Sequence, residues 1–112
     1  MLSKAQLIQL ITRNDEVSQR AIGRALVHLL NRQTEVESTQ NRTIEHNNRG
    51  FTSSDARQGS IHAKYWLKHG QLLEWQIKYW LKPNRRGTPR LAKYWRQLAE
   101  EAKKKQLRAA AK

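Results

Sequence analysis

Cysteine is missing from this sequence, and its absence removes three kinds of chemistry at once. Without a thiol there is no disulfide, no thiolate metal site and no cysteine nucleophile. Long apolar runs are missing too, since no stretch approaches the roughly 20 residues needed to span a bilayer. The apolar segment from Leu7 to Ile11 is too short for the core of a secretory signal peptide. We therefore expect a cytoplasmic protein that makes no use of a membrane.

Acidic residues are scarce, and they are unevenly placed. The 112 residues include 22 lysines and arginines against 9 aspartates and glutamates, a net charge of +13. Residues 1–48 carry 6 basic and 5 acidic side chains, whereas residues 49–112 carry 16 and 4. This imbalance predicts a single domain with a near-neutral scaffold half (1–48), a basic half (49–107) and a frayed tail (108–112).

Signatures of catalysis are absent as well. The sequence has no glycine-rich phosphate loop, no Gly-x-Ser-x-Gly and no His-Glu-x-x-His. His62 and His69 are seven residues apart and could share a helix face, but no acid stands with them to complete a metal site. Asp55 and Glu74 are explained as residues of helix starts, which leaves no carboxylate pair in the basic half. We expect a protein that is not an enzyme, with no catalytic residue, metal or cofactor.

The first half of the chain is rich in helix signals. Ser3 with Gln6 forms a capping box for a short first helix, and Asn14-Asp15 begins a stronger helix that reaches about Arg32. Thr34 with Glu37 predicts a further, mostly polar helix up to His46. The apolar stripe of the second helix follows a 3.6-residue spacing: Ile22, Ala25, Leu26, Leu29 and Leu30. This stripe predicts that residues 1–32 form a scaffold or a self-association surface.

The second half begins with a turn at 47–50 and continues as helices separated by clear breaks. Thr52 with Asp55 predicts a capping box for a helix over 53–69, closed by Gly70. A shorter helix over 72–82 ends at Pro83, and the loop 83–87 follows. Thr88 caps the last helix, with Pro89 at its first position. The expected buried stripes of the first and last of these helices are Ala56, Gly59, Ala63 and Leu67, and then Leu91, Trp95, Leu98 and Ala102. Because every periodic stretch fits 3.6 better than 2, the fold is predicted to be all-α, a compact bundle of about four to six short helices.

The triplet Lys-Tyr-Trp occurs three times in this half, at 64–66, 78–80 and 93–95. Such a stretch indicates either a core of rings with a lysine rim, or rings and lysines that both face a nucleic acid. Helical spacing places Trp66, Trp80 and Trp95 in the core or at its edge, and leaves the tyrosines more open. The tryptophan outside the triplets, Trp75, falls with Lys78, Tyr79 and Lys82 on a face that excludes Leu73, Ile77 and Leu81. Trp75 is therefore expected to be exposed, as a platform for base stacking or as a helix–helix contact.

Arginines in and beside the loop 83–87 make the densest positive spot of the sequence. Arg85 and Arg86, with Arg90, are expected to bind phosphate, unless the loop is simply solvated. The run Lys103–Lys105 is weaker support, because Glu100 and Glu101 stand at the right spacing to pair with two of its members. The predicted nucleic-acid-binding residues are Arg49, Arg57, Lys64, Lys68, Trp75, Lys78, Tyr79, Lys82, Arg85, Arg86 and Arg90.

Scattered motifs over about residues 33–98 add a family resemblance. They are Thr43-Ile44-Glu45-His46-Asn47, Gly50-Phe51, Asp55-Ala56, Gly70, Leu72, Gln76, Lys93-Tyr94 and Gln97-Leu98. This pattern resembles a small basic helical module of bacteriophage, plasmid and other mobile-element proteins, often found near replication and recombination functions. Leu73 stands where that module usually has a threonine. The resemblance implies a setting connected with DNA and supplies no mechanism.

Two functions fit these patterns. The first is a non-enzymatic nucleic-acid-binding protein, for DNA more than RNA, that contacts mainly phosphates and stacks Trp75 on bases; the 53–69 helix is the candidate for entering a major groove. The second is a mobile-element interaction protein whose basic, aromatic surface docks on an acidic host protein, such as a nuclease or a defence complex. Tryptophan and arginine are enriched in both kinds of interface, so composition leaves the two open.

Overall fold

The computed structural model describes residues 2–40 and 50–110. These form five α-helices and one 3-10 helix: α1 (Lys4–Ile11), α2 (Glu16–Gln40), α3 (Ala56–His69), α4 (Glu74–Leu81), η1 (Arg90–Tyr94) and α5 (Trp95–Ala110). No strand occurs within these residues, and the nearest approach to one is an isolated bridge between Pro83 and Pro89. The predicted all-α bundle is confirmed. The predicted turn residues 47–49 and the expected helix over 41–46 lie outside the described residues.

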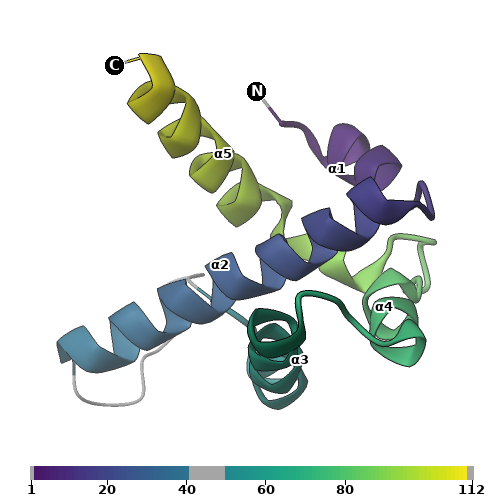
Figure 1. Ribbon diagram of the computed structural model, residues 1–112, viewed down its shortest axis with the longest axis horizontal. Coiled ribbons are helices and arrows are strands. Elements are labelled where there is room, and N and C mark those ends of the chain that lie inside the picture. The colour runs from purple at the N-terminus through teal and green to yellow at the C-terminus, as the bar shows by residue number, and fades with distance from the viewer. Residues whose placement is uncertain (1, 41–49, 111–112) are drawn as a thin grey trace.

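Helix α2 organises the bundle. It crosses the whole molecule, with α1 and α5 on one side of it and α3 and α4 on the other (Figure 1). Its apolar stripe is buried, with Ile22, Leu26 and Leu29 fully covered, and packs in one core with residues of every other helix. The stripe is therefore covered by the chain's own helices, as expected for a scaffold. Self-association through other surfaces of residues 1–32 stays a prediction.

Helix ends follow local hydrogen bonding, as the sequence predicted for α1 and α2. Ser3 and Gln6 make the expected reciprocal capping box, with Gln6 N donating to Ser3 Oγ over 3.1 Å and Ser3 N to Gln6 Oε1 over 2.9 Å. Asp15 accepts from Ser18 N over 2.8 Å at the start of α2. The predicted break between Arg32 and Thr34 is wrong, since α2 continues to Gln40. No glycine or proline stands there to interrupt the helical ladder.

Helices α2 and α3 pack closely because a glycine on α2 admits a large ring. A Cβ at Gly23 would overlap the indole of Trp66, and one at Gly59 of α3 would overlap the ring of Phe51. Trp66 thus lies at the core edge, as expected, and Trp80 is fully buried. The predicted stripe of α3 is wrong at Leu67, which is 59% exposed. The buried side of α3 is rotated toward α4 and consists of Gly59, His62 and Ala63.

The last helix begins later than predicted. Pro89 caps the 3-10 turn η1 instead of starting an α-helix, and α5 begins at Trp95. The cause is a hairpin-like closure of the preceding loop, in which Arg90 N donates to Lys82 O over 3.0 Å. Leu91 and Leu98 are buried as predicted, and Trp95 packs against the core edge. At the other end α5 continues to Ala110, so the helix extends past Leu107, where fraying was expected.

Candidate nucleic-acid interface

The outward face of α3 carries a stripe of cations. Arg57, Lys64 and Lys68 recur at helical spacing around Ile61, and all four residues are exposed. None of the three cations pairs with an acid in the part of the chain that the structure describes. We call these four residues the α3 stripe. Its predicted members are confirmed as exposed, and they lie side by side on one rigid element.

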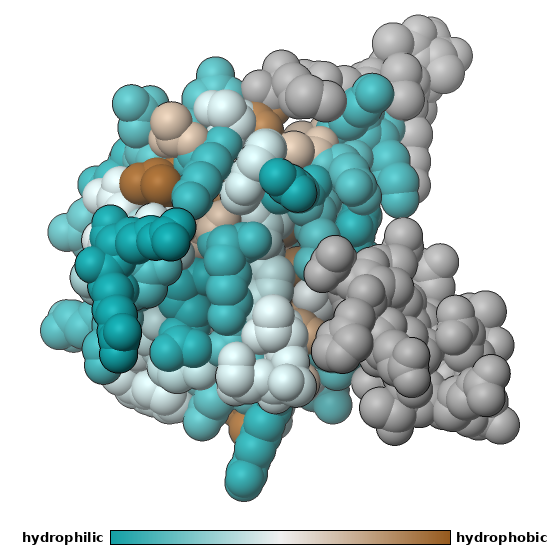
Figure 2. All heavy atoms as spheres, turned by 180° about the vertical axis from the view of Figure 1, so that it is seen from behind, coloured by the Kyte–Doolittle hydropathy of each residue, from teal (hydrophilic) through white to brown (hydrophobic). Residues whose placement is uncertain are grey.

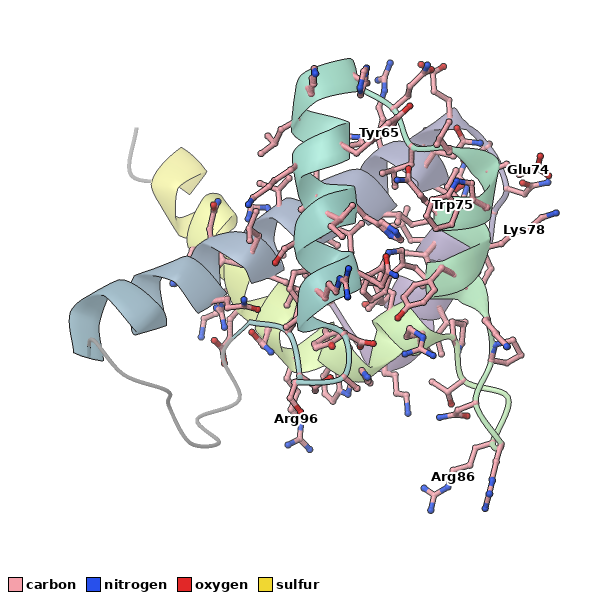
Figure 3. The ribbon with its side chains drawn as sticks, turned by 90° about the horizontal axis from the view of Figure 1, so that it is seen from below. Tyr65, Glu74, Trp75, Lys78, Arg86 and Arg96 are labelled. Atoms are coloured by element: carbon pink, nitrogen blue, oxygen red, sulfur yellow. The ribbon has the colours of Figure 1, made fainter. Side chains whose placement is uncertain are left out.

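Trp75 lies on α4 and leans toward α3. It is 55% exposed, which confirms the predicted exposure. The covered part of the indole meets the imidazole of His62 edge to face, with ring centroids 5.1 Å apart and an interplanar angle of 86°. In Figure 3, Trp75 and Tyr65 both project into the space between α3 and α4, whereas Lys78 points away from α3. Trp75 therefore combines an anchored edge with an open part, as a stacking platform requires.

The expected grouping of Trp75 with Lys78, Tyr79 and Lys82 is wrong as a single face. Lys78 lies on the outer side of α4 and pairs with Glu74, Nζ to Oε1, over 3.2 Å. The Tyr79 ring is half-buried and covered by the guanidinium of Arg90, whose Cζ is 4.6 Å from the ring centroid. Lys82 is exposed at the end of α4, without an acid partner among the described residues. On this eight-residue helix, Trp75 and Tyr79 both contact His62 of α3, with ring centroids 5.1 Å and 5.6 Å away, whereas Lys78 lies on the outer side.

The predicted role of Asp55 in a capping box at the start of α3 is wrong. Asp55 has no side-chain capping bond, and its carboxylate is fully buried. Arg90 Nη1 and Lys93 Nζ each lie 2.7 Å from its oxygens, and the Tyr94 hydroxyl donates to it over 2.5 Å. This carboxylate ties the start of α3 to η1. Its ligands come from residues far along the chain, so local spacing gave no sign of it.

Charge and burial act in opposite directions on Asp55. Burial alone would raise the pKa of its carboxyl, but hydrogen bonds from Lys93, Tyr94 and Arg90 outweigh it and hold that pKa below the ordinary value. Burial, and after it the hydrogen bond to Asp55, raises the pKa of the Tyr94 hydroxyl. Tyr94 is buried, so the expectation that the triplet tyrosines are more open is wrong at this position. The buried phenol has a hydrogen-bond acceptor, because it donates to the Asp55 carboxylate.

A second ion-pair cluster holds α2 to α5. Arg32 is 4% exposed and donates from Nη2 to Glu100 and from Nε to Glu101, both over 2.9 Å. Glu101 thus serves mainly Arg32, and its contact with Lys104 is longer at 3.7 Å. Burial opposes the charge of Glu101, but the hydrogen bond from Arg32 keeps the pKa of this carboxyl below its ordinary value. From the sequence, both glutamates were expected to form ion pairs with lysines of their own helix, and no partner was predicted for Arg32.

The loop after α4 is closed by its own hydrogen bonds. Asn84 Oδ1 accepts from Arg86 N over 2.8 Å and from Thr88 N over 3.0 Å, and Gly87 has φ of +79°. Arg85 and Arg86 are exposed on it, and Arg86 points away from the body of the molecule (Figure 3). Neither has an acid partner in residues 2–40 or 50–110. The loop therefore presents its arginines on a fixed turn, although Arg90 is turned inward to Asp55.

Two further surface side chains, Tyr65 and Arg96, were not among the predicted binding residues. Tyr65 of the α3 helix is half-buried, and its ring lies against that of His69 with centroids 4.2 Å apart. It follows Lys64 and precedes Lys68 by three residues, so it borders the α3 stripe on the side of α4. Arg96 is exposed, with its guanidinium 5.5 Å from the centroid of Trp95 (Figure 3). The sequence did offer a sign for Tyr65, because it is the tyrosine of the first Lys-Tyr-Trp triplet and stands between two predicted binding lysines.

His62 explains why the two-histidine metal site does not form in the described structure. It is fully buried, and its Nδ1 accepts from Trp80 Nε1 over 2.9 Å. Burial lowers its pKa, so the neutral imidazole carries its proton on Nε2, which has no hydrogen-bond partner. His69 is exposed on the surface and contacts Tyr65. No group of three His, Asp or Glu residues converges anywhere in the described residues.

Of the predicted site residues, Arg57, Lys64 and Lys68 share the outward face of α3, and Trp75 of α4 lies against His62 on another side of α3. Lys82, Arg85 and Arg86 lie at or beside the loop after α4, and Arg49 lies outside the described residues. No helix among the described residues has the length and apolar character to cross a bilayer. Comparison of the chain with family models, with curated proteins and with solved structures gave no match.

Proposed function

We propose that this protein binds nucleic acid, DNA in the first place, and that it does so mainly through the phosphate backbone. The observation that carries the proposal is a group of exposed cations on α3, at the end of α4 and in the loop after it, which have no acid partner in the described chain: Arg57, Lys64, Lys68, Lys82, Arg85 and Arg86. Like charges held close together on a folded surface repel one another, and a polyanion relieves that repulsion. The release of counterions from the polyanion adds to the binding free energy.

The acids of the basic half are arranged so that they do not neutralise these cations. Asp55 is buried with Arg90 and Lys93, and Glu100 and Glu101 are used by Arg32. Glu74 is exposed, but it is paired with Lys78 on the side of α4 away from α3. The α3 stripe and the loop thus keep their positive charge. This division of charge supports binding rather than catalysis.

Aromatic rings of α3 and α4 suggest how unpaired bases would be held. Trp75 of α4 offers its exposed part, and Tyr65 of α3 projects into the space between the same two helices (Figure 3). Stacking of a base on such a ring contributes about 1–3 kcal/mol and is tolerant of sequence. We therefore favour single-stranded DNA over duplex as the tighter ligand, with the α3 stripe on its phosphates.

A salt titration tests the proposal. Fluorescence anisotropy with a labelled single strand and a labelled duplex gives the slope of log K against log salt, which is expected to be steep for both. The double variant Lys64→Ala with Lys68→Ala should make the slope shallower by about two units, one for each lost phosphate contact. Its matched control removes the same charge from exposed positions of α1 and α5, as Lys4→Ala with Lys103→Ala. A flat salt dependence, or equal effects of the two double variants, would contradict the proposal.

The second candidate, docking on an acidic protein, is favoured by three exposed apolar residues around the α3–α4 connection: Leu67, Leu73 and Trp75. The face turned away from the viewer in Figure 1 is largely hydrophilic where it is described, with separate hydrophobic spots only (Figure 2). A protein partner would therefore engage the α3–α4 side. Nuclease treatment separates the two candidates. Absorbance at 260 nm that copurifies with the protein and is removed by nuclease supports nucleic acid, whereas a nuclease-resistant protein complex supports docking.

A further inference from the structure

A cleft lies beside the loop after α4, and it includes Lys82, one of the residues that the sequence grouped with Trp75. It is lined by Lys82, Pro83, Asn84, Pro89, Arg90 and Lys93 and has a volume of about 280 Å³. That size is just below the range of roughly 300–1,000 Å³ in which drug-sized ligands bind. The cleft therefore suits a small group or the end of a longer molecule.

The charges around this cleft do not cancel. Three of its lining side chains are cationic, and the carboxylate nearest to them, Asp55, is shared by Arg90 and Lys93 at 2.7 Å each. Asp55 is fully buried behind them, whereas Arg90 and Lys93 keep about a third of their side chains exposed. Lys82, at the end of α4, has no acid partner within the described residues. One negative charge against three positive ones leaves the cleft attractive to an anion.

Arg90 is held in place before any ligand arrives. Its Nη1 is bonded to Asp55, and its guanidinium lies over the ring of Tyr79 with Cζ 4.6 Å from the centroid. A guanidinium has five N–H donors, and no other side-chain donor of Arg90 has a partner among the described residues. Because the side chain is already fixed, binding would cost little of the rotamer entropy that a free surface arginine loses. Pro83 and Pro89 stiffen the walls on either side.

From this geometry we infer that the cleft between Lys82 and Arg90 is a binding site for one phosphate group. The guanidinium fork of Arg90 contacts phosphate oxygens, and Lys82 supplies a second positive charge. The NH₂ group of Asn84, which also lines the cleft, can donate a further hydrogen bond. In the setting of the proposed function, on which this inference rests for its biological ligand, the group is either an internal phosphodiester or the terminal phosphate of a strand. The chemistry of the group is the same in both cases.

Titration of the full chain with inorganic phosphate, followed by two-dimensional amide NMR, tests the site without nucleic acid. The expected result is saturable shifts of the amides of Lys82, Asn84, Arg90 and Lys93, larger than those at α1 and α5.

Lys82→Ala should weaken phosphate binding by about fivefold, the effect of one nearby charge in a partly solvated cleft. The matched control Lys103→Ala, which removes the same charge from exposed α5, should leave it unchanged. Arg90→Lys keeps the charge and an ammonium for Asp55 but loses the fork, so phosphate affinity should fall while the melting temperature stays close to that of the wild type.

The two sources of the phosphate are distinguished by oligonucleotides with and without a 5′-phosphate. If the phosphorylated strand binds more tightly, and Lys82→Ala removes this difference in affinity, the site takes a terminal phosphate. Equal binding of both strands that is weakened by Lys82→Ala identifies a phosphodiester. Phosphate shifts spread evenly over the surface, or equal effects of Lys82→Ala and Lys103→Ala, would overturn the site even if nucleic acid binds elsewhere. Saturable phosphate binding in the cleft without any oligonucleotide binding would support the site and refute the proposed function.

Discussion

Replacing Asp55 with asparagine removes the negative charge at the junction of α3 and η1 while keeping the shape of the side chain. In the wild type this fully buried carboxylate receives two ion pairs of 2.7 Å and a phenolic hydrogen bond. Removing one partner of a fully buried pair costs roughly 3–5 kcal/mol, because the remaining charge is left uncompensated. Here Arg90 and Lys93 are each about a third exposed, so water screens part of that cost. We expect Asp55→Asn to lower the free energy of unfolding by about 2–4 kcal/mol at pH 7.

The pH dependence of this loss follows from the direction of the pKa shift. The folded-state pKa of Asp55 lies below its ordinary value of 3.8, so the unfolded chain binds the proton more tightly than the folded one. The stabilisation is therefore fully present above pH 3.8 and is lost as the pH falls through the folded-state pKa. Asparagine does not titrate, so the difference between wild type and variant should shrink in acid.

Urea unfolding, followed by tryptophan fluorescence at pH 7 and at several values below 3.8, measures both effects. Asp15→Asn is the matched control, because it makes the same chemical change at the start of α2, where Asp15 is only partly buried. Asparagine is as good an N-cap as aspartate, so this control should change stability by only a few tenths of a kcal/mol. If Asp55→Asn costs no more than Asp15→Asn at pH 7, or if its cost is the same in acid, the buried-carboxylate account is refuted.

Four further perturbations probe the core, the interface (two of them) and the buried imidazole. Leu26→Ala should lower the free energy of unfolding by about 2–5 kcal/mol in urea titrations; full stability with lost nucleic-acid binding would refute its role as scaffold. Trp75→Ala should weaken single-strand binding by about 1–3 kcal/mol in anisotropy and duplex binding much less, with unchanged thermal melts; early melting would identify a structural residue instead. The double variant Arg85→Ala with Arg86→Ala should weaken both ligands and reduce the salt slope by about one unit per lost contact, whereas an unchanged slope would remove the loop from the interface. Burial lowers the pKa of His62 below 6.5, so wild-type stability should decline as the pH falls from 6.5 through the folded-state pKa; melts of His62→Gln should lack this decline, and parallel curves would contradict it.

Helices were predictable because their signals are local. The capping box at Ser3, the left-handed Gly70 and the break at Pro83 each act within one turn of the chain, and each ends or begins a helix as expected. The same local reasoning failed where a distant residue changes the outcome. Thr52 and Asp55 have the spacing of a capping box. The Asp55 carboxylate instead forms ion pairs with Arg90 and Lys93, which follow α4 in the sequence.

Exposure on helices was predictable in part. The α3 stripe and Trp75 follow from 3.6-residue periodicity, and both are exposed. Periodicity gives the relative angle of side chains on one helix but not which direction faces a neighbour. That missing rotation is why Leu67 was expected to be buried and His62 was not. The buried side of α3 is set by the positions of α2 and α4, which the sequence alone did not give.

The three Lys-Tyr-Trp triplets repeat a sequence but not a role. Lys78 is paired with Glu74 and Lys93 with Asp55, so only Lys64 among the triplet lysines lacks an acid partner in the described residues. The aromatic positions build the core: Trp66 fits against Gly23, Trp80 is bonded to His62, and Tyr94 to Asp55. The triplet is therefore mainly a packing unit, and neighbouring acids decide what each lysine does.

The residue two places after each triplet is then the better guide to binding. In the first two copies it is a lysine, Lys68 and Lys82, and both are exposed without an acid partner in the described chain. In the third copy it is Gln97, which bonds both backbone groups of Gly50, at 2.7 Å and 3.0 Å, and so has a structural role. We expect Lys68→Ala with Lys82→Ala to weaken DNA binding and to make the salt slope shallower by about two units.

The matched comparison is Lys78→Ala with Lys104→Ala, which removes the same charge from lysines that already have acid partners. Loss of Lys78 frees the exposed Glu74 carboxylate, whereas Glu101 keeps its ion pair with Arg32 when Lys104 is lost, and neither change removes an expected phosphate contact. Repulsion from the freed carboxylate should weaken binding slightly at low salt, but the slope should change by less than in the first pair. Anisotropy over a range of salt concentrations, with melts to establish that both pairs fold, gives the comparison. Equal slopes for the two variants would mean that an acid partner does not decide which lysines reach the DNA.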